Sequence, residues 1–176
     1  MPQRSPARSK PCRESRTATG YSASHRDVRF SKDKAPYNAH LHVSLSRKGA
    51  GQDGGPAWMV GLDPDGLVLG VGIFAFTPAQ LDRWRTLCAG AEGASVAGLL
   101  GQLEEQDVRI AEPELKRVPA PYEADHPRAA LLRRKGLTAW IDHSDPEIAF
   151  GPDGPRSCAR SLAKLQEVFG LLVSLG

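Results

Sequence analysis

Cysteine is scarce in this chain of 176 residues. The three cysteines, Cys12, Cys88 and Cys158, lie far apart and form no Cys-x-x-Cys pair. An odd, dispersed set argues against a disulfide framework and against a metal site built from thiolates. We therefore expect the protein to reside in a reducing compartment, the cytoplasm.

Long apolar runs are missing too. No stretch approaches the roughly 20 residues that cross a bilayer, and the first twenty residues lack the apolar block of a secretory signal. Hydrophobic residues make up 40% of the chain and charged residues 24%, which is usual for a globular protein. We expect a soluble single domain without membrane association. Its oligomeric state is not indicated.

Positive charge is concentrated at the start of the chain. Of the 23 Lys and Arg residues, five lie in residues 1–20 with one acidic residue, Glu14, so the remainder is nearly neutral. Nucleic-acid binding needs many cations on one face, and nucleic acid is therefore not an expected partner. Residues 1–25 are rich in Arg, Ser and Pro, a composition that cannot offset chain entropy. We predict a disordered basic tail over 1–25 and one domain over 26–176.

Apolar periodicity predicts a mixed fold. Strict alternation over 40–46 indicates a half-buried strand, and 58–62 with 67–76 indicate a hairpin around a Pro-Asp-Gly turn. The second hairpin strand is apolar on both faces, which places it centrally, and Gly70 and Gly72 predict a shallow trough on one face.

Helix signals follow the hairpin. Thr77, Pro78 and Gln80 form a capping box, and an i, i+3, i+4, i+7 pattern begins at 95. A short helix over 128–135, a strand over 137–142 and an amphipathic helix from 156 complete the pattern. The fold class is α+β, a mostly antiparallel sheet with flanking helices.

The densest polar segment is RDVRFSKDK, residues 26–34. Its four cations outnumber its two carboxylates, so cationic groups remain for an anion such as phosphate or carboxylate. We predict Arg29 and Lys34 as anion ligands, oriented by Arg26 and Asp27. The alternative is a structural ion-pair network that anchors the first ordered segment.

Other polar groups could complete this site. Tyr37 and His40 would stand near the anion, over the glycine trough. Lys116 and Arg117 would join it if they converge with Arg29 in the folded chain.

The segment RDVRFSKDKAPY resembles the signature of an uncharacterised bacterial and fungal family, the domain of unknown function 2461. Agreement in order and spacing continues through His40, Gly70-Val71-Gly72, Thr77-Pro78, Leu115-Lys116-Arg117-Val118-Pro119 and Asp125-His126-Pro127. The resemblance implies no activity, cofactor or catalytic residue, because the family has none established.

The resemblance stops abruptly at Arg26. Family members have aromatic-rich helices upstream and an arginine at the position of Ala23. This boundary suggests that a wrong start, a wrong frame or a deletion has replaced the N-terminal helices, and their loss would expose the sheet face that they cover.

Metal and cofactor signatures are weak. His40 and His42 lie two apart on one strand, where two imidazoles can share a zinc ion with His126, Asp125 or His143. Two histidines on a solvated face explain the pattern better, and we expect no metal. Dinucleotide, Walker and Gly-x-Ser-x-Gly motifs are missing, so no cofactor is expected.

Asp125 or His126 is better suited to capping the helix at Pro127 than to acid–base chemistry.

Two functions remain open at this point. The first is binding of a small anionic ligand through residues 26–34, and the sequence does not decide whether catalysis accompanies it. The second is a structural or protein-interaction module in which the same segment is only an ion-pair network.

Overall fold

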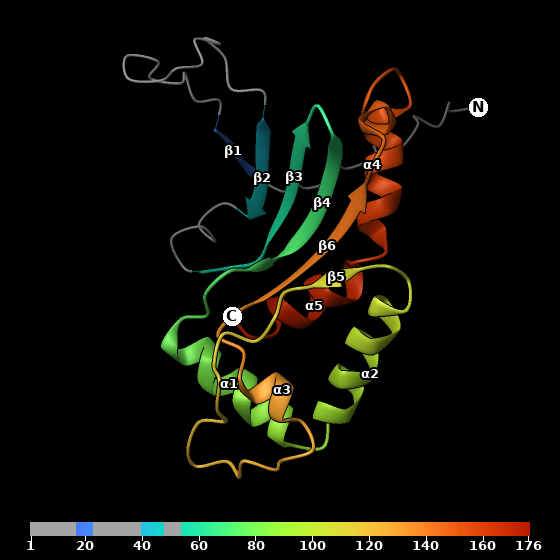
Figure 1. Cartoon of the computed structure of the whole chain (residues 1–176). Coiled ribbons are helices and arrows are strands. Elements are labelled where there is room, and N and C mark those ends of the chain that lie inside the picture. Colours follow the sequence, from blue (N-terminus) through green and yellow to red (C-terminus); the bar gives the residue numbers. More distant parts are fainter. Residues whose placement is uncertain (1–16, 23–39, 48–53) are drawn as a thin grey trace, which may run out of the picture.

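A computed structural model describes residues 17–22, 40–47 and 54–176 of the chain. Six strands form one sheet in the order β1-β2-β3-β4-β6-β5, and every neighbouring pair is antiparallel (Figure 1). The strands are β1 (Thr17–Ser22), β2 (Leu41–Arg47), β3 (Ala57–Asp63), β4 (Gly66–Ile73), β5 (Arg109–Ile110) and β6 (Leu137–His143). The α+β class with a mostly antiparallel sheet is confirmed.

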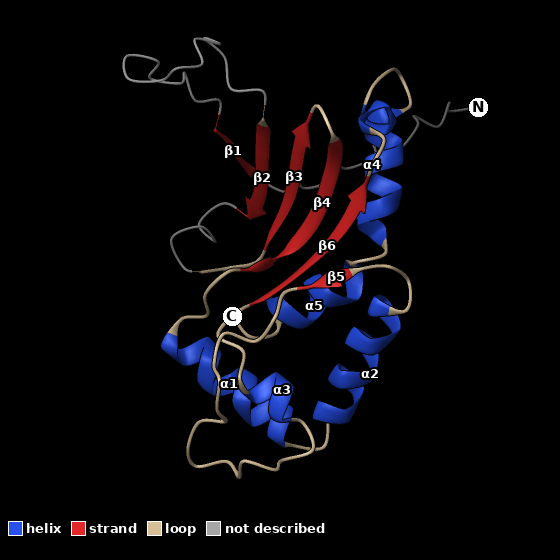
Figure 2. Cartoon of the chain, in the orientation of Figure 1, coloured by secondary structure: helices blue, strands red, loops and turns tan. Residues whose placement is uncertain are grey.

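Helices lie beside and below this sheet in the view of Figure 2. They are α1 (Pro78–Ala89), α2 (Gly93–Glu104), α3 (Ala129–Leu132), α4 (Gly154–Ala163) and α5 (Gln166–Val173), with a 3-10 turn at Pro146–Ala149. None of these helices is long and apolar enough to cross a membrane, a finding that covers the described residues only.

Alternation along β4 gives the sheet two different faces. Leu67, Leu69 and Val71 are completely buried, because they point toward the helices, where α4 and α5 contact this strand. Val68 and Gly70, which alternate with them, point to the opposite side. We call that side, which carries Ser44, Met59, Gly70 and Trp140 in one register row, the outer face.

The hydrophobic core lies between the inner face and the helices. Trp84 of α1 is fully buried, contacts Phe76 and donates from its indole Nε1 to the Leu131 carbonyl oxygen at 2.9 Å. Arg128 closes the C-terminal end of α1, where its guanidinium donates to the carbonyl oxygens of Cys88, Ala89 and Gly90. These carbonyls have no partner within the helix, so the arginine satisfies groups that burial would otherwise penalise.

Most predicted elements are found close to their predicted positions. The hairpin of β3 and β4 is confirmed, as is the capping box, in which Thr77 and Gln80 exchange side-chain and backbone hydrogen bonds. The predicted C-terminal helix is wrong in one respect, because it breaks into α4 and α5 at Leu165, whose side chain is fully buried.

The strand β1 differs from the expected disorder over 1–25. Its six residues pair with β2 along their whole length, from Thr17 opposite Arg47 to Ser22 opposite His42. The composition argument averaged over the segment and missed Thr17, Thr19 and Tyr21, residue types that favour strands. The rest of 1–25 lies outside the described residues.

Candidate functional site: a groove on the outer face

A groove of about 700 Å³ runs over the outer face of the sheet. Its lining residues come from five strands or their ends: His42, Val43, Ser44, Met59, Val60, Gly61, Asp63, Val68, Phe74, Arg109 and Trp140. The register explains how they meet. His42, Gly61 and Val68 form one row across the sheet, and Ser44, Met59 and Trp140 form the next. Residues that are far apart in the sequence thus share one surface.

Glycines in the central strands make room for two rings. A Cβ atom on Gly70 would lie 2.3 Å from Cε3 of Trp140, so the indole of β6 occupies the space that a side chain on β4 would fill. A Cβ on Gly61 would lie 3.4 Å from Nδ1 of His42, which shows that the imidazole of β2 leans over β3. The trough predicted at Gly70 and Gly72 is therefore filled by the side chains of Trp140 and Thr138. The groove lies above that filling.

Trp140 is held from several sides. Its Nε1 donates to Oγ1 of Thr138 at 3.0 Å, its ring centroid lies 6.2 Å from that of Phe74, and the guanidinium carbon of Arg109 lies 5.9 Å from the same ring. Arg109 is fixed in turn by two 2.8 Å hydrogen bonds to Asp142. The arrangement gives the groove a rigid aromatic surface at one end.

The Arg109–Asp142 pair is the strongest described ion pair near the groove. Two parallel N–H···O bonds form the geometry that guanidinium and carboxylate favour. The hydrogen bond from Arg109 holds the pKa of Asp142 below its ordinary value, although partial desolvation opposes the shift. Asp142 thus neutralises Arg109, which leaves little positive charge there for a ligand.

Polar groups gather at the other end of the groove. His42 is exposed on β2, and Asp63 ends β3 beside the hairpin turn. One oxygen of Asp63 accepts from the backbone N–H of Asp65 at 2.9 Å, and the other lies 3.8 Å from Nδ1 of His40. The groove is therefore aromatic and apolar at one end and acidic at the other.

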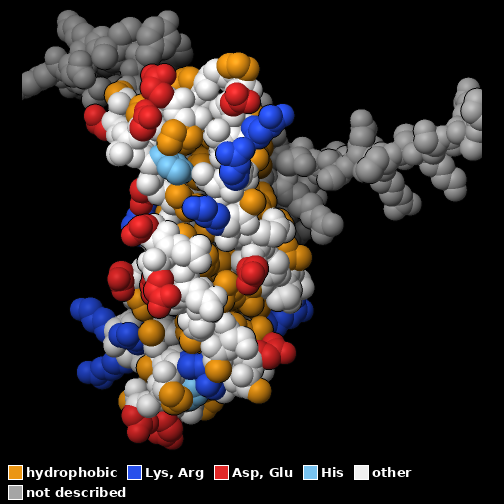
Figure 3. Space-filling view, turned by 90° about the vertical axis from the view of Figure 1, so that its right-hand side faces the viewer, with side chains coloured by type: hydrophobic (Ala, Val, Ile, Leu, Met, Phe, Trp, Pro, Cys, Tyr) orange, Lys and Arg blue, Asp and Glu red, His pale blue; other side chains and the backbone are white. Residues whose placement is uncertain are grey.

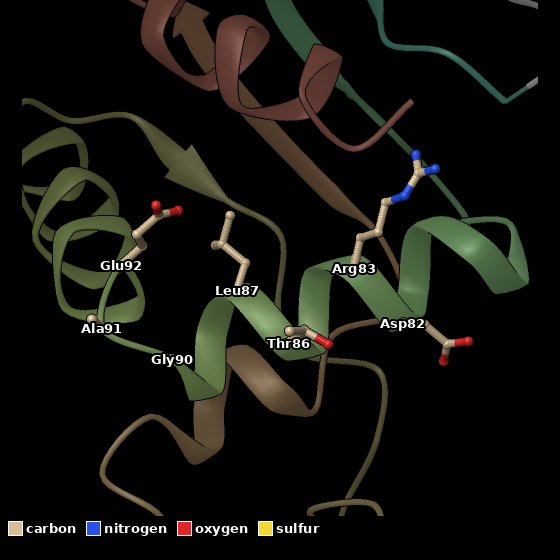
Figure 4. A pocket seen from close by; sticks show the side chains of 7 residues that line it. All are labelled: Asp82, Arg83, Thr86, Leu87, Gly90, Ala91 and Glu92. Carbon is tan, nitrogen blue, oxygen red and sulfur yellow. The ribbon is translucent and has the colours of Figure 1, made fainter.

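A second hollow, of about 570 Å³, lies along α1 and the start of α2 (Figure 4). Its labelled side chains point in different directions, and Arg83 donates to the backbone oxygens of Leu175 and Gly176 at 2.8 and 2.7 Å. Because its charged groups do not converge, this hollow offers no arrangement for binding or chemistry.

The predicted anion site is only partly within the described residues. Arg26, Asp27, Arg29, Lys34 and Tyr37 lie outside them, so their convergence stays a prediction. His40 is exposed next to Asp63 at the hairpin end of the sheet. Lys116 and Arg117 are also exposed. They belong to the loop between β5 and α3, at the opposite end of the molecule in Figure 1, and the structure does not bring them to His40.

The charged side chains on the face shown in Figure 3 form no further candidate site. On the face shown in Figure 3, Lys and Arg side chains are interspersed with Asp and Glu side chains. No group of three possible metal ligands occurs in the described ranges 17–22, 40–47 and 54–176. His126 Nδ1 accepts the backbone N–H of Arg128 at 3.0 Å. Arg128 precedes α3, and no side chain caps that helix, so the capping interpretation of Asp125 or His126 is wrong.

Cys88 of α1 is a described residue whose thiol pKa departs strongly from its ordinary value. Burial raises the pKa of Cys88 to about 12, although the positive charges of Arg128 and Arg134 oppose the shift. A thiol that stays protonated at neutral pH is a poor nucleophile. Cys88 is therefore a core residue of α1, and no covalent catalysis is assigned to it.

This assignment predicts the reactivity of Cys88. In a Cys12→Ser/Cys158→Ser variant at pH 8, a disulfide reagent such as DTNB should label no thiol in the native state and one thiol in denaturant. The protonated thiol also stabilises the fold fully below pH 9.0, the ordinary pKa, and this contribution should be lost as the pH rises toward about 12. Rapid labelling of the native variant would contradict the burial.

Sequence reasoning missed the aromatic end of the groove. Leu137, Ala139 and Ile141 alternate with Trp140, so the pattern places a large indole on the outer face, and this signal could have been used. Arg109 carried no comparable signal, because its position depends on the pairing of β5 with β6.

The fold and the groove define an α+β domain with a groove on the outer face of its sheet that is large enough for a small ligand. A family model of conserved hypothetical proteins, DUF2461, matches residues 13–170 of the chain. The chain belongs to this family. The match includes residues 13–25, where we expected the resemblance to have ended. No curated protein and no solved structure matches the chain.

Proposed function

We propose that this domain binds a small organic ligand in the outer-face groove. The observation that carries the proposal is Trp140, a half-buried indole held by Thr138, Phe74 and Arg109 at the edge of a hollow of about 700 Å³. Ligand pockets are commonly 300–1,000 Å³ in volume and are apolar with a few converging polar groups.

The rigidity of this surface favours binding over a purely structural role. A side chain that is already fixed loses little conformational entropy when a ligand covers it. Phe74 extends the aromatic surface and is 69% exposed. Its burial by a ligand would therefore remove apolar area from water, which is favourable.

The sequence-derived proposal that residues 26–34 bind an anionic group is kept as a separate proposal from the groove. In it, Arg26, Arg29 and Lys34 would meet a phosphate or carboxylate group. The Arg29→Ala variant should then weaken binding of phosphorylated and carboxylated compounds while leaving neutral compounds unaffected.

We also propose a cytoplasmic location for the protein. The free thiols of Cys88 and Cys158 support this proposal.

A thermal-shift screen of small organic compounds tests the function. Ser44→Trp places a large side chain in the groove at an exposed position, and Ser95→Trp makes the same change at an exposed position of α2. Compounds that raise the melting temperature of the wild type and of Ser95→Trp should fail to stabilise Ser44→Trp.

Equal stabilisation of both variants would place binding elsewhere and contradict the proposal. If no compound stabilises the wild type, the alternative function gains support. In that alternative the exposed Phe74 and the groove contact another protein, and residues 26–34 only form ion pairs.

A further inference from the structure

We infer that the described part of the groove selects an amphipathic organic cation, an amine with an aromatic or alkyl body. The inference rests on the proposed function and adds the charge and orientation of the ligand. The body would lie against Trp140 and Phe74, and the ammonium group would lie at Asp63.

The charges of the lining residues support this choice. Arg109 is the described cation of the groove, and both of its bonds to Asp142 are short and parallel. Asp63 has no Lys or Arg partner among the described residues. Its charged-type neighbour there is the exposed His40, whose Nδ1 lies 3.8 Å from the carboxylate. Asp63 is therefore the acidic group at the polar end of the groove, and a carboxylate favours a cation.

The two ends of the groove are well separated. Asp63 and Met59 lie four residues apart on β3, and Met59 shares its register row with Trp140. Four residues of strand span about 13 Å. A ligand that reaches both ends must therefore be elongated, with its apolar part over Met59 and Trp140 and its polar group toward the hairpin.

The aromatic end would hold the body of such a ligand without needing its charge. Phe74 and Trp140 form a tilted pair with ring centroids 6.2 Å apart, and Val68 and Met59 border the same hollow. Apolar and aromatic side chains of this kind bind rings and alkyl chains by area and shape. The charge of the ligand is then decided at Asp63.

Three matched probes test the inference: 6-phenylhexylamine, 6-phenylhexanol and 6-phenylhexanoate. They share one body and differ in a terminal group that is cationic, neutral or anionic at pH 7. Binding to the full chain is followed by the indole N–H signals in a ¹⁵N-correlated NMR titration, with the signal of Trp140 assigned through Trp140→Phe. We expect the amine to shift the Trp140 signal and to bind about tenfold more tightly than the acid, since a half-exposed carboxylate attracts one and repels the other.

Asp63→Asn separates charge from structure. An Asn side-chain oxygen can still accept the N–H of Asp65 that Asp63 accepts, so the turn is preserved. We expect this variant to bind the amine and the acid within about twofold of each other. Asp65→Asn, the same substitution at the exposed neighbour, should retain the full preference for the amine.

The outcomes distinguish this inference from the proposed function. Tighter binding of the acid would overturn the cation preference and support the anion prediction for residues 26–34. Equal binding of all three probes at Trp140 would also overturn it while leaving the groove as a binding site. No shift of Trp140 with any probe would count against the groove itself.

Discussion

Trp84→Ala should destabilise the domain by about 3–5 kcal/mol, the range for deletion of a large buried aromatic side chain. Trp84 is completely buried at the centre of the contact between α1 and α3, and it packs against Phe76 at 5.5 Å between ring centroids. The substitution would leave a cavity and strand the carbonyl oxygen of Leu131. The free energy of unfolding from urea denaturation, followed by far-UV circular dichroism, measures the loss.

Trp84→Phe serves as the matched variant for this prediction. It retains an aromatic ring but removes the indole N–H, so its cost should be smaller, about 1–3 kcal/mol for an unsatisfied buried acceptor and a smaller ring. A Trp84→Ala protein with nearly unchanged stability would show that α1 and α3 do not share the core described for them.

Gly70→Ala should destabilise the domain by about 1–3 kcal/mol, the usual cost of forcing extra volume into a packed site. The added methyl would overlap the indole of Trp140, with three ring atoms within 2.9 Å. Gly61→Ala is the matched control on the neighbouring strand. Its methyl would meet His42 and Val68 at ordinary distances of 3.4–3.8 Å, so we expect little change or a small gain, since alanine restricts the unfolded chain.

A double-mutant cycle assigns this cost to the indole. If Trp140 fills the space above Gly70, the Gly70→Ala substitution should cost almost nothing in a Trp140→Ala background. Thermal or urea unfolding of the four proteins gives the coupling energy. An undiminished cost in that background would mean that the methyl collides with backbone instead.

Elements that depend on neighbouring residues in the sequence were predicted well. The alternation of β4 and β6, the turn at Pro64 and Asp65, and the capping box at Thr77 and Gln80 depend on neighbouring residues, and the structure confirms them. The break between α4 and α5 was missed because an uninterrupted apolar stripe continues across Leu165. Leu165, at the break, is fully buried.

The groove was harder to predict, because it depends on partners across the sheet. Gly70 was correctly seen as a position where something approaches the backbone, but Trp140, which approaches it, is 70 residues later in the chain. The anion site at residues 26–34 was predicted from composition, which shows that charged side chains are present but not where they lie in the fold. Arg109 and Asp142 were missed for the converse reason, since each is isolated in the sequence and acquires its role only through the pairing of β5 with β6.

Intermolecular nuclear Overhauser effects between 6-phenylhexylamine and the full chain would test most directly whether the outer-face groove is a binding site. Our account predicts contacts from the phenyl protons of the probe to the ring protons of Trp140 and Phe74. Contacts of those protons to the Trp58–Phe169 pair, whose rings stack 4.9 Å apart, with none to Trp140, would contradict it.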